Sequence, residues 1–203
     1  MGDDILDARS LTEVHMFLLA SACRSCGRGP LETSPDLSAL ERGHVSVDAN
    51  CRHCGVLHRL DFQVPQGSDV CNRDDLYPII NASDEPSRIL DVGQWLVLFR
   101  VLLESAGRET NKVESRRLGY EASQCLEEAI KFYEDNDLPP STAVFCGSSR
   151  QRLREHPELF SKTHLIELRA KLPNLTAMQR QLSRGVSEPV ARKRWWHRWK
   201  LRG

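Results

Sequence analysis

The sequence predicts an α+β protein in which a small cysteine-rich module of short antiparallel strands is joined to an α-helical domain. Two features of the 203-residue chain lead to this fold class. Residues 22–65 combine two CxxC pairs with stretches of alternating apolar and polar residues, which are typical of strands. From residue 88 onward, apolar residues recur at the spacing that is typical of helices.

An N-terminal segment, residues 1–21, precedes the cysteine-rich module and contains the first predicted helix. Ser10 and Glu13 have the spacing of a capping box, in which a hydroxyl and a carboxylate accept hydrogen bonds from free backbone N–H groups. Apolar residues then follow at helical spacing, which favours a helix over residues 11–20. The stretch VHMFLLA within this segment is also compatible with a strand.

The cysteine-rich module, residues 22–65, contains two stretches with a period of two. Residues 44–50 and 59–64 each place apolar side chains at every second position, so each is predicted to be a strand with one buried face. Proline, glycine, aspartate and asparagine are frequent beyond this module. This composition favours a connecting loop over residues 66–87.

The α-helical domain, residues 88–186, begins with a strongly apolar segment. Asp91 is a suitable N-cap for it, and Gly107 is a suitable stop. Between them, apolar and aromatic side chains occupy most faces of a helix, which predicts a central, buried position.

A longer amphipathic helix is predicted over residues 112–136, where Pro139 and Pro140 are expected to end it. Its inward stripe comprises Leu118, Ala122, Cys125, Leu126, Ala129, Ile130 and Tyr133. Shorter helices are expected at about 149–155, 161–171 and 175–184, separated by prolines.

The two CxxC pairs, separated by 24 residues, are the clearest motif of the sequence. A CxxC turn directs two thiolates toward one ion, and two such turns supply the four-thiolate tetrahedral shell that Zn²⁺ favours. A glycine follows the second cysteine of each pair, where the turn favours a positive φ angle. The sequence therefore predicts a zinc site made of Cys23, Cys26, Cys51 and Cys54.

The four-cysteine shell is closed, whereas a catalytic zinc keeps one position open for water or substrate. We therefore expect a structural zinc ion and assign no catalytic residue. His44, His53 and His58 lie near the second pair, but no thiolate is missing for them to replace, so we interpret them as polar bystanders. Free thiols, a redox couple and an iron–sulfur cluster are the alternatives to zinc.

The motifs CRSCG and CRHCG, within residues 22–64, resemble the zinc-ribbon fold group. That resemblance implies a zinc-holding β-hairpin module but no specific activity, because the group spans unrelated functions. The stretch LTEVHMFLLASACRSCGRGP, followed by PSRILDVGQWL, is similar to a set of uncharacterised bacterial proteins with a zinc-ribbon-like start and a helical remainder. This second resemblance implies that the two halves form one unit.

Cys71, Cys125 and Cys146 lie outside the CxxC pairs. Cys125 falls on an apolar helix stripe and is expected in the core. Cys146 precedes a predicted helix, whose dipole can lower the pKa of a thiol, so a Cys–His nucleophilic site with a histidine of the same half is a further hypothesis. The acidic pairs in loop-like sequence are interpreted as solvated turns or helix caps; they are Asp74–Asp75 and Asp84–Glu85.

The C-terminal tail, residues 187–203, differs in charge from the rest of the chain. It carries a net charge of +5 and the remainder carries −5, although the whole chain is neutral. Basic residues alternate with tryptophans, a pattern that suits nucleic-acid phosphates and bases, an anionic membrane surface or a protein partner. The alternative, which we favour over each of these single roles, is a helix end packed on the helical domain or a disordered, solubilising end. The candidate contacts are Arg192, Lys193, Arg194, Trp195, Trp196, Arg198, Trp199 and Lys200.

These observations favour a non-enzymatic adaptor or regulatory protein that acts through protein–protein contacts. A nucleic-acid-binding protein that uses the zinc module and the basic tail is the alternative, and a zinc-stabilised enzyme is the third hypothesis. No apolar run approaches the ~20 residues that span a bilayer. The acidic start, MGDDILDARS, lacks the features of a signal peptide, so we expect a cytoplasmic protein with reduced thiols.

Overall fold

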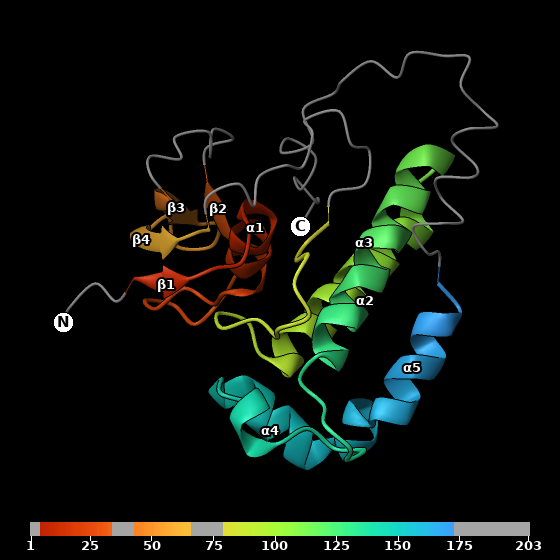
Figure 1. Ribbon diagram of the computed structural model, residues 1–203. Coiled ribbons are helices and arrows are strands. Elements are labelled where there is room, and N and C mark those ends of the chain that lie inside the picture. Colours follow the sequence, from red (N-terminus) through yellow and green to blue (C-terminus); the bar gives the residue numbers. More distant parts are fainter. Residues whose placement is uncertain (1–4, 34–42, 66–78, 173–203) are drawn as a thin grey trace.

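A computed structural model describes residues 5–33, 43–65 and 79–172 of the chain, and it confirms the α+β fold class (Figure 1). A four-stranded sheet and α1 form one side of the molecule, and α2 and α3 lie beside them (Figure 1). The elements are β1 Leu6–Asp7, α1 Leu11–Ala20, β2 Leu31–Thr33, β3 His44–Cys51, β4 Leu57–Gln63, α2 Val92–Arg108, α3 Lys112–Ile130, α4 Gly147–Glu155 and α5 Lys162–Ala170, with 3-10 turns at Ser141–Ala143 and Pro157–Phe160.

The sheet has the strand order β1-β4-β3-β2. β3 and β4 form an antiparallel hairpin, β2 pairs antiparallel with β3, and the short β1 adds in parallel to β4. Both predicted strands are confirmed, because alternate residues such as Val45, Val47 and Phe62 are buried on one face. β1 places part of the N-terminal segment in the same sheet as the cysteine-rich module.

Helix α1 begins where the capping pattern predicts. The Ser10 hydroxyl accepts a 3.0 Å hydrogen bond from the backbone N–H of Glu13, so the N-cap is confirmed. The Glu13 carboxylate, however, accepts from the backbone N–H of Arg9 and not from that of Ser10. The Ser10 hydroxyl also donates to the carbonyl of Ile80, which joins the start of α1 to the segment that follows the sheet.

Helix α2 has the predicted Asp91 cap, in which Asp91 and Gln94 exchange hydrogen bonds of 2.9 and 3.1 Å. It continues one residue past Gly107, the predicted stop, and ends at Arg108. The expectation of burial on most faces is wrong for part of the helix, since Val101 and Leu103 are about 40% exposed.

Helix α3 buries the predicted apolar stripe but ends at Ile130, earlier than predicted. The two prolines lie well beyond its end and do not terminate it. The chain leaves the helix through a tighter turn, in which Tyr133 N donates to Ile130 O at 3.0 Å. The Tyr133 hydroxyl then donates to the carbonyl of Phe160 at 2.6 Å, which fixes the new direction.

A second stripe of α3 is polar and is also removed from water. Its members are Arg117, Glu121, Gln124 and Glu128, with Lys131 just beyond the end of the helix, and the last three of these contact residues 80–83. Gln124 Oε1 accepts a 2.9 Å hydrogen bond from the backbone N–H of Ile80, and Lys131 Nζ donates to the carbonyl of Ser83 at 2.6 Å. The helix therefore packs with apolar residues on one side and with hydrogen bonds on another. The predicted helices near 149–155 and 161–171 are confirmed as α4 and α5, while residues 175–184 lie outside the described part of the chain.

Candidate metal centre

The second CxxC pair forms the turn of the β3–β4 hairpin. Cys51 N donates to Val56 O at 2.9 Å, and Gly55 N donates to Cys51 O at 2.9 Å, so the backbone closes tightly around the pair. Gly55 has a φ of 70°, a conformation that glycine adopts without the steric cost of a Cβ. The sequence pattern CRHCG therefore folds as a local turn that directs both thiols to the same side.

The first CxxC pair repeats this turn almost bond for bond. Cys23 N donates to Arg28 O at 2.7 Å, Gly27 N donates to Cys23 O at 2.8 Å, and Gly27 has the same φ of 70°. Equal sequence spacing thus produces equal local geometry in two separate parts of the chain.

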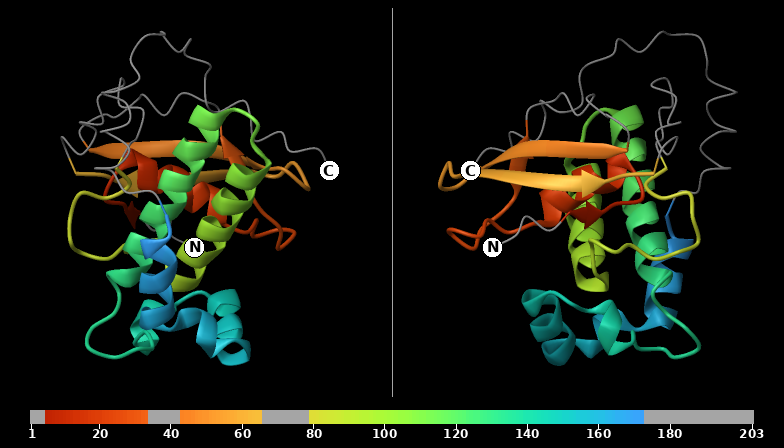
Figure 2. Two further views of the ribbon diagram at one scale, coloured as in Figure 1. Left: turned by 90° about the vertical axis from the view of Figure 1, so that its right-hand side faces the viewer. Right: turned by 60° about the vertical axis from the view of Figure 1, so that its left-hand side comes forward.

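Strand pairing brings the two turns together. The first turn leads into β2, and β2 pairs with β3 so that Leu31 lies opposite Cys51. The chain that leaves the first turn therefore runs beside the start of the second turn. Figure 2 (right) shows both turns at the same end of the sheet.

The four predicted cysteine ligands lie close together, in an arrangement that can hold a metal ion. Their sulfur atoms all lie within 4.8 Å of one another, and the Cys23–Cys54 and Cys26–Cys51 sulfur pairs are each 3.6 Å apart. A tetrahedral zinc with Zn–S bonds of ~2.3 Å requires sulfur–sulfur distances of ~3.8 Å. The spacing fits a single ion and leaves little room for a cluster of several irons.

Hydrogen bonds from the backbone and from His58 to the cysteine sulfurs change the pKa values of the thiols. Desolvation raises the pKa of Cys23, but hydrogen bonds from the Cys26 N–H, from His58 and from the Ser25 N–H outweigh it and lower the pKa to about 5. The Val56 N–H lowers the pKa of Cys54, but desolvation and the neighbouring sulfurs outweigh it and raise the pKa to about 12. The first cysteine of each pair thus ionises most readily, since the pKa of Cys51 is lowered too.

The two histidines of the second CxxC region differ in their relation to the sulfurs. His53 is exposed, and its contact with the sulfurs comes from its backbone N–H, which donates to Cys51 Sγ at 3.4 Å. His58 is half-buried, and its ring Nε2 lies 3.2 Å from Cys23 Sγ. His58 therefore contacts the cysteine cluster, which its interpretation as a polar bystander did not include. Strand alternation contained this information, because His58 lies two residues before the buried Leu60 and shares its face.

The remaining cysteines do not form a reactive site within the described residues. Cys125 is fully buried as predicted, and burial raises the pKa of its thiol well above the ordinary value. Cys146 precedes α4 as expected, but burial and the nearby Asp91 carboxylate raise the pKa of its thiol to about 11. The expectation that the helix dipole lowers the pKa of Cys146 is therefore wrong, because burial and the carboxylate beside it oppose ionisation.

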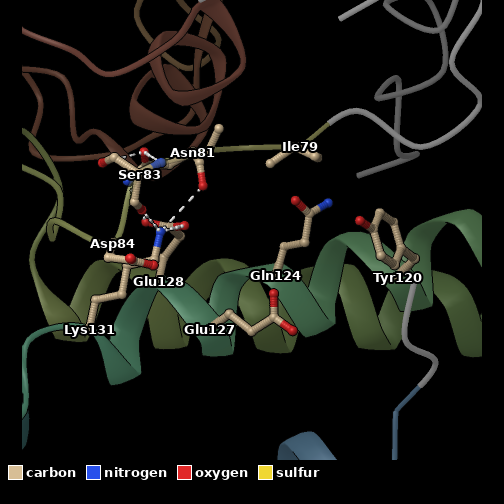
Figure 3. A pocket seen from close by; sticks show the side chains of 10 residues that line it. Ile79, Asn81, Ser83, Asp84, Tyr120, Gln124, Glu127, Glu128 and Lys131 are labelled. Atoms are coloured by element: carbon tan, nitrogen blue, oxygen red, sulfur yellow. Dashed lines mark hydrogen bonds and ion pairs between the residues drawn. The ribbon is translucent and has the colours of Figure 1, made fainter. Parts of the chain in front are cut away.

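A pocket of about 260 Å³ lies between residues 79–84 and α3 (Figure 3). Glu128 and Asn81 meet in it through a 3.1 Å hydrogen bond, and Lys131 Nζ donates to Glu128 Oε1 at 2.6 Å. Burial raises the pKa of Glu128 to about 7, although Lys131 and Asn81 oppose the shift. These bonds hold the loop on the helix, so Glu128 and Lys131 serve the packing of the two segments.

Several predicted residues lie outside the described part of the chain, namely Cys71, Asp74, Asp75 and the whole tail with its basic residues and tryptophans. No family model matches the chain, and no curated protein or solved structure matches it either. Within the described ranges, no helix is both long enough and apolar enough to cross a bilayer. Among the described residues, the cysteine cluster is therefore the feature that bears most directly on function.

Proposed function

We propose that this chain is a zinc-binding, non-enzymatic adaptor or regulatory protein whose four-cysteine site is structural. The observation that carries this proposal is the spacing of the four sulfur atoms, which matches one tetrahedral ion. Four thiolates fill the coordination shell of zinc, so no position remains for water or a substrate. When bound, the ion supplies cross-linking and not Lewis-acid chemistry.

The architecture around the cysteines supports a structural role. The two CxxC turns hold few large apolar residues, so a bound ion would supply much of their stability; zinc binds small zinc-finger peptides with about 10–16 kcal/mol. The ends of β2, β3 and β4 all depend on the position of these turns. Metal binding therefore fixes the shape of one end of the sheet.

The adaptor role rests on the way in which the sheet and the helices share one core. Buried apolar residues of the sheet, α1, α2 and α3 form a single cluster. A rigid unit of this kind presents a composite surface that suits a protein partner, in a cytoplasm that keeps the thiols reduced. Turnover of any substrate that depends on a side chain of the helical half would contradict this role.

Metal analysis of the full-length protein tests the zinc proposal. We expect one equivalent of zinc in the purified protein and much less in a Cys51→Ser/Cys54→Ser variant. Cys146→Ser is the matched control, because it removes a thiol outside the cluster and should retain zinc. One equivalent of iron in place of zinc, or equal zinc content in all three proteins, would contradict the proposal.

Nucleic-acid binding is the second candidate function, and the charge around the cysteine turns favours it. Residues 22–31 and 51–60 contain no acidic residue, and their arginines are exposed, namely Arg24, Arg28, Arg59 and Arg52, the last of which pairs with Glu32 at 3.7 Å. Together with the basic tail, they provide cations for phosphate contacts.

Salt dependence tests this second candidate. The full chain and a variant without residues 187–203 are titrated with single- and double-stranded oligonucleotides at several salt concentrations. Phosphate contacts release counterions, so the affinity must fall as salt rises, and it must fall further when the tail is deleted. Absence of binding at low salt, or binding that does not depend on salt, would contradict nucleic-acid binding and leave the protein-partner role as the remaining candidate.

A further inference from the structure

His58 contacts the cysteine cluster although it is not one of the four cysteine ligands. Its ring Nε2 lies 3.2 Å from Cys23 Sγ, within hydrogen-bond reach of a sulfur. The position of His58 is fixed by the hairpin, where it pairs with Ala49 of β3. Cys23 is buried, so water competes little for this contact.

The sulfur of Cys23 is a suitable acceptor for this histidine. A metal-bound thiolate keeps lone pairs that can accept an N–H, and the Ser25 backbone N–H already lies 3.3 Å from Cys23 Sγ. Four thiolates around one divalent ion carry a net charge of −2, and N–H donors spread that charge. The Nε2–H tautomer of His58 provides a donor from a side chain, in addition to those from the turn itself.

We propose that His58 is a positioning residue of the metal centre: its Nε2–H donates a hydrogen bond to the Cys23 thiolate, which fixes this ligand and slows the loss of the metal. The proposal rests on the zinc site proposed above. His58 is not a fifth ligand in this account, because the four sulfur atoms already complete a tetrahedron. It acts on the ion only through Cys23.

Competition with a chromophoric chelator tests the effect on affinity in the full-length protein. We expect His58→Ala to bind zinc about 10-fold or more weakly than the wild type, since loss of an outer hydrogen-bond partner costs 10–100-fold. His58→Gln retains an N–H donor and should lose less. His53→Ala is the matched control, because His53 lies between Cys51 and Cys54 and contacts a sulfur only through its backbone.

Cobalt substitution distinguishes a hydrogen bond from a merely structural role. An N–H donor lowers the energy of sulfur lone pairs, so its removal should move the thiolate-to-cobalt charge-transfer band of His58→Ala to longer wavelength. The band of His53→Ala should not move. A variant that only loosened the fold would bind metal more weakly with the band unchanged.

The outcomes separate this inference from the zinc proposal. Wild-type protein that binds neither zinc nor cobalt would contradict the zinc site itself. Wild-type protein that binds one equivalent, with affinity and band position unchanged in His58→Ala, would overturn the role of His58 alone. A spectrum that shows imidazole bound to cobalt in the wild type, lost in His58→Ala, would also overturn it by making His58 a ligand.

Discussion

The backbone N–H of Cys146 donates a 2.7 Å hydrogen bond to Oδ2 of Asp91, which lies 55 residues earlier in the chain. The other oxygen of the same carboxylate accepts from the backbone N–H of Gln94 at 2.9 Å and from the hydroxyl of Ser149 at 2.7 Å. Asp91 is fully buried, and α4 has no side-chain cap of its own. One carboxylate therefore caps α2 and joins its start to the start of α4.

We expect Asp91→Ala to destabilise the protein by about 3 kcal/mol or more, because it leaves three donors without their acceptor and each buried unsatisfied group costs about 1–3 kcal/mol. Asn111→Ala is the control, since Asn111 caps only α3 and is exposed. It should cost about 1 kcal/mol, the usual value for an N-cap. Urea unfolding at saturating zinc measures the free energy of unfolding of both variants. Equal losses of stability would show that the bonds from Asp91 to Cys146 and Ser149 add nothing.

Two glycines of α2 should respond in opposite directions to the same substitution. A Cβ on Gly93 would lie 2.4 Å from Ser149 Oγ and 2.5 Å from Ser149 Cβ, whereas a Cβ on Gly107 would meet nothing within 4 Å. Gly107→Ala should raise the free energy of unfolding by up to about 1 kcal/mol through helix propensity. Gly93→Ala should lower it by about 1–3 kcal/mol through overpacking, which thermal unfolding can detect. Stabilisation by both variants would mean that α4 does not pack closely on α2.

The parts of the fold that depend on local pattern could be predicted from the sequence. The alternation around Val45 and Phe62 predicts buried strand faces, and Asp91 predicts the start of α2, because each depends on neighbours in the chain. The end of α3 could not be predicted, since it depends on the bond between Tyr133 and Phe160. Proline marks where a helix cannot continue, not where tertiary contacts end it earlier.

The polar stripe of α3 shows the limit of pattern analysis most clearly. Charged residues at helical spacing indicate a solvent-facing side, yet Glu121 and Glu128 are almost fully buried. Glu128 lies against the segment that follows the sheet, where Asn81 donates a hydrogen bond to it, a packing that local sequence does not reveal. The cysteine ligands, in contrast, followed from spacing alone, while His58 required the register of β3 and β4 to be known.

Burial of Glu128 should leave a measurable dependence of stability on pH. Its pKa is raised from 4.5 to about 7. Between pH 4.5 and pH 7, Glu128 is therefore protonated in the folded state and ionised in the unfolded state. The contribution of Glu128 to the free energy of unfolding therefore falls as pH rises from about 4.5 to about 7, and it is constant above that range. The difference between wild type and Glu128→Gln, measured by urea unfolding from pH 5 to 8, should decline with pH and then level off. A difference that is flat over the whole range would contradict this.

His15 should give a pH dependence of the opposite sign. Burial, and then the charge of Arg117, lower the pKa of His15 from 6.5 to about 3. The unfolded state therefore binds the extra proton below about pH 6.5, and the wild type loses stability as the pH falls. His15→Gln lacks this proton uptake, so the stability of the wild type relative to the variant should decrease between pH 6.5 and pH 5. The same urea series measures it, and a slope of the same sign as that of Glu128 would be inconsistent with a buried neutral imidazole.

Removal of the metal should loosen the two CxxC turns far more than the helices. The turns are held by the proposed ion and by short backbone bonds, whereas α2 and α3 make the most extensive contact between any two described elements. After zinc is removed with a chelator under reducing conditions, we expect amide exchange to accelerate by 10-fold or more in residues 22–30 and 51–57. The amides of α2 and α3 should change much less, because their protection reflects helix–helix packing. Readdition of zinc should restore the slow exchange, and magnesium, which prefers oxygen ligands, should not. An equal loss of protection in both regions would instead mean that the sheet and the helices unfold as one cooperative unit that depends on the ion.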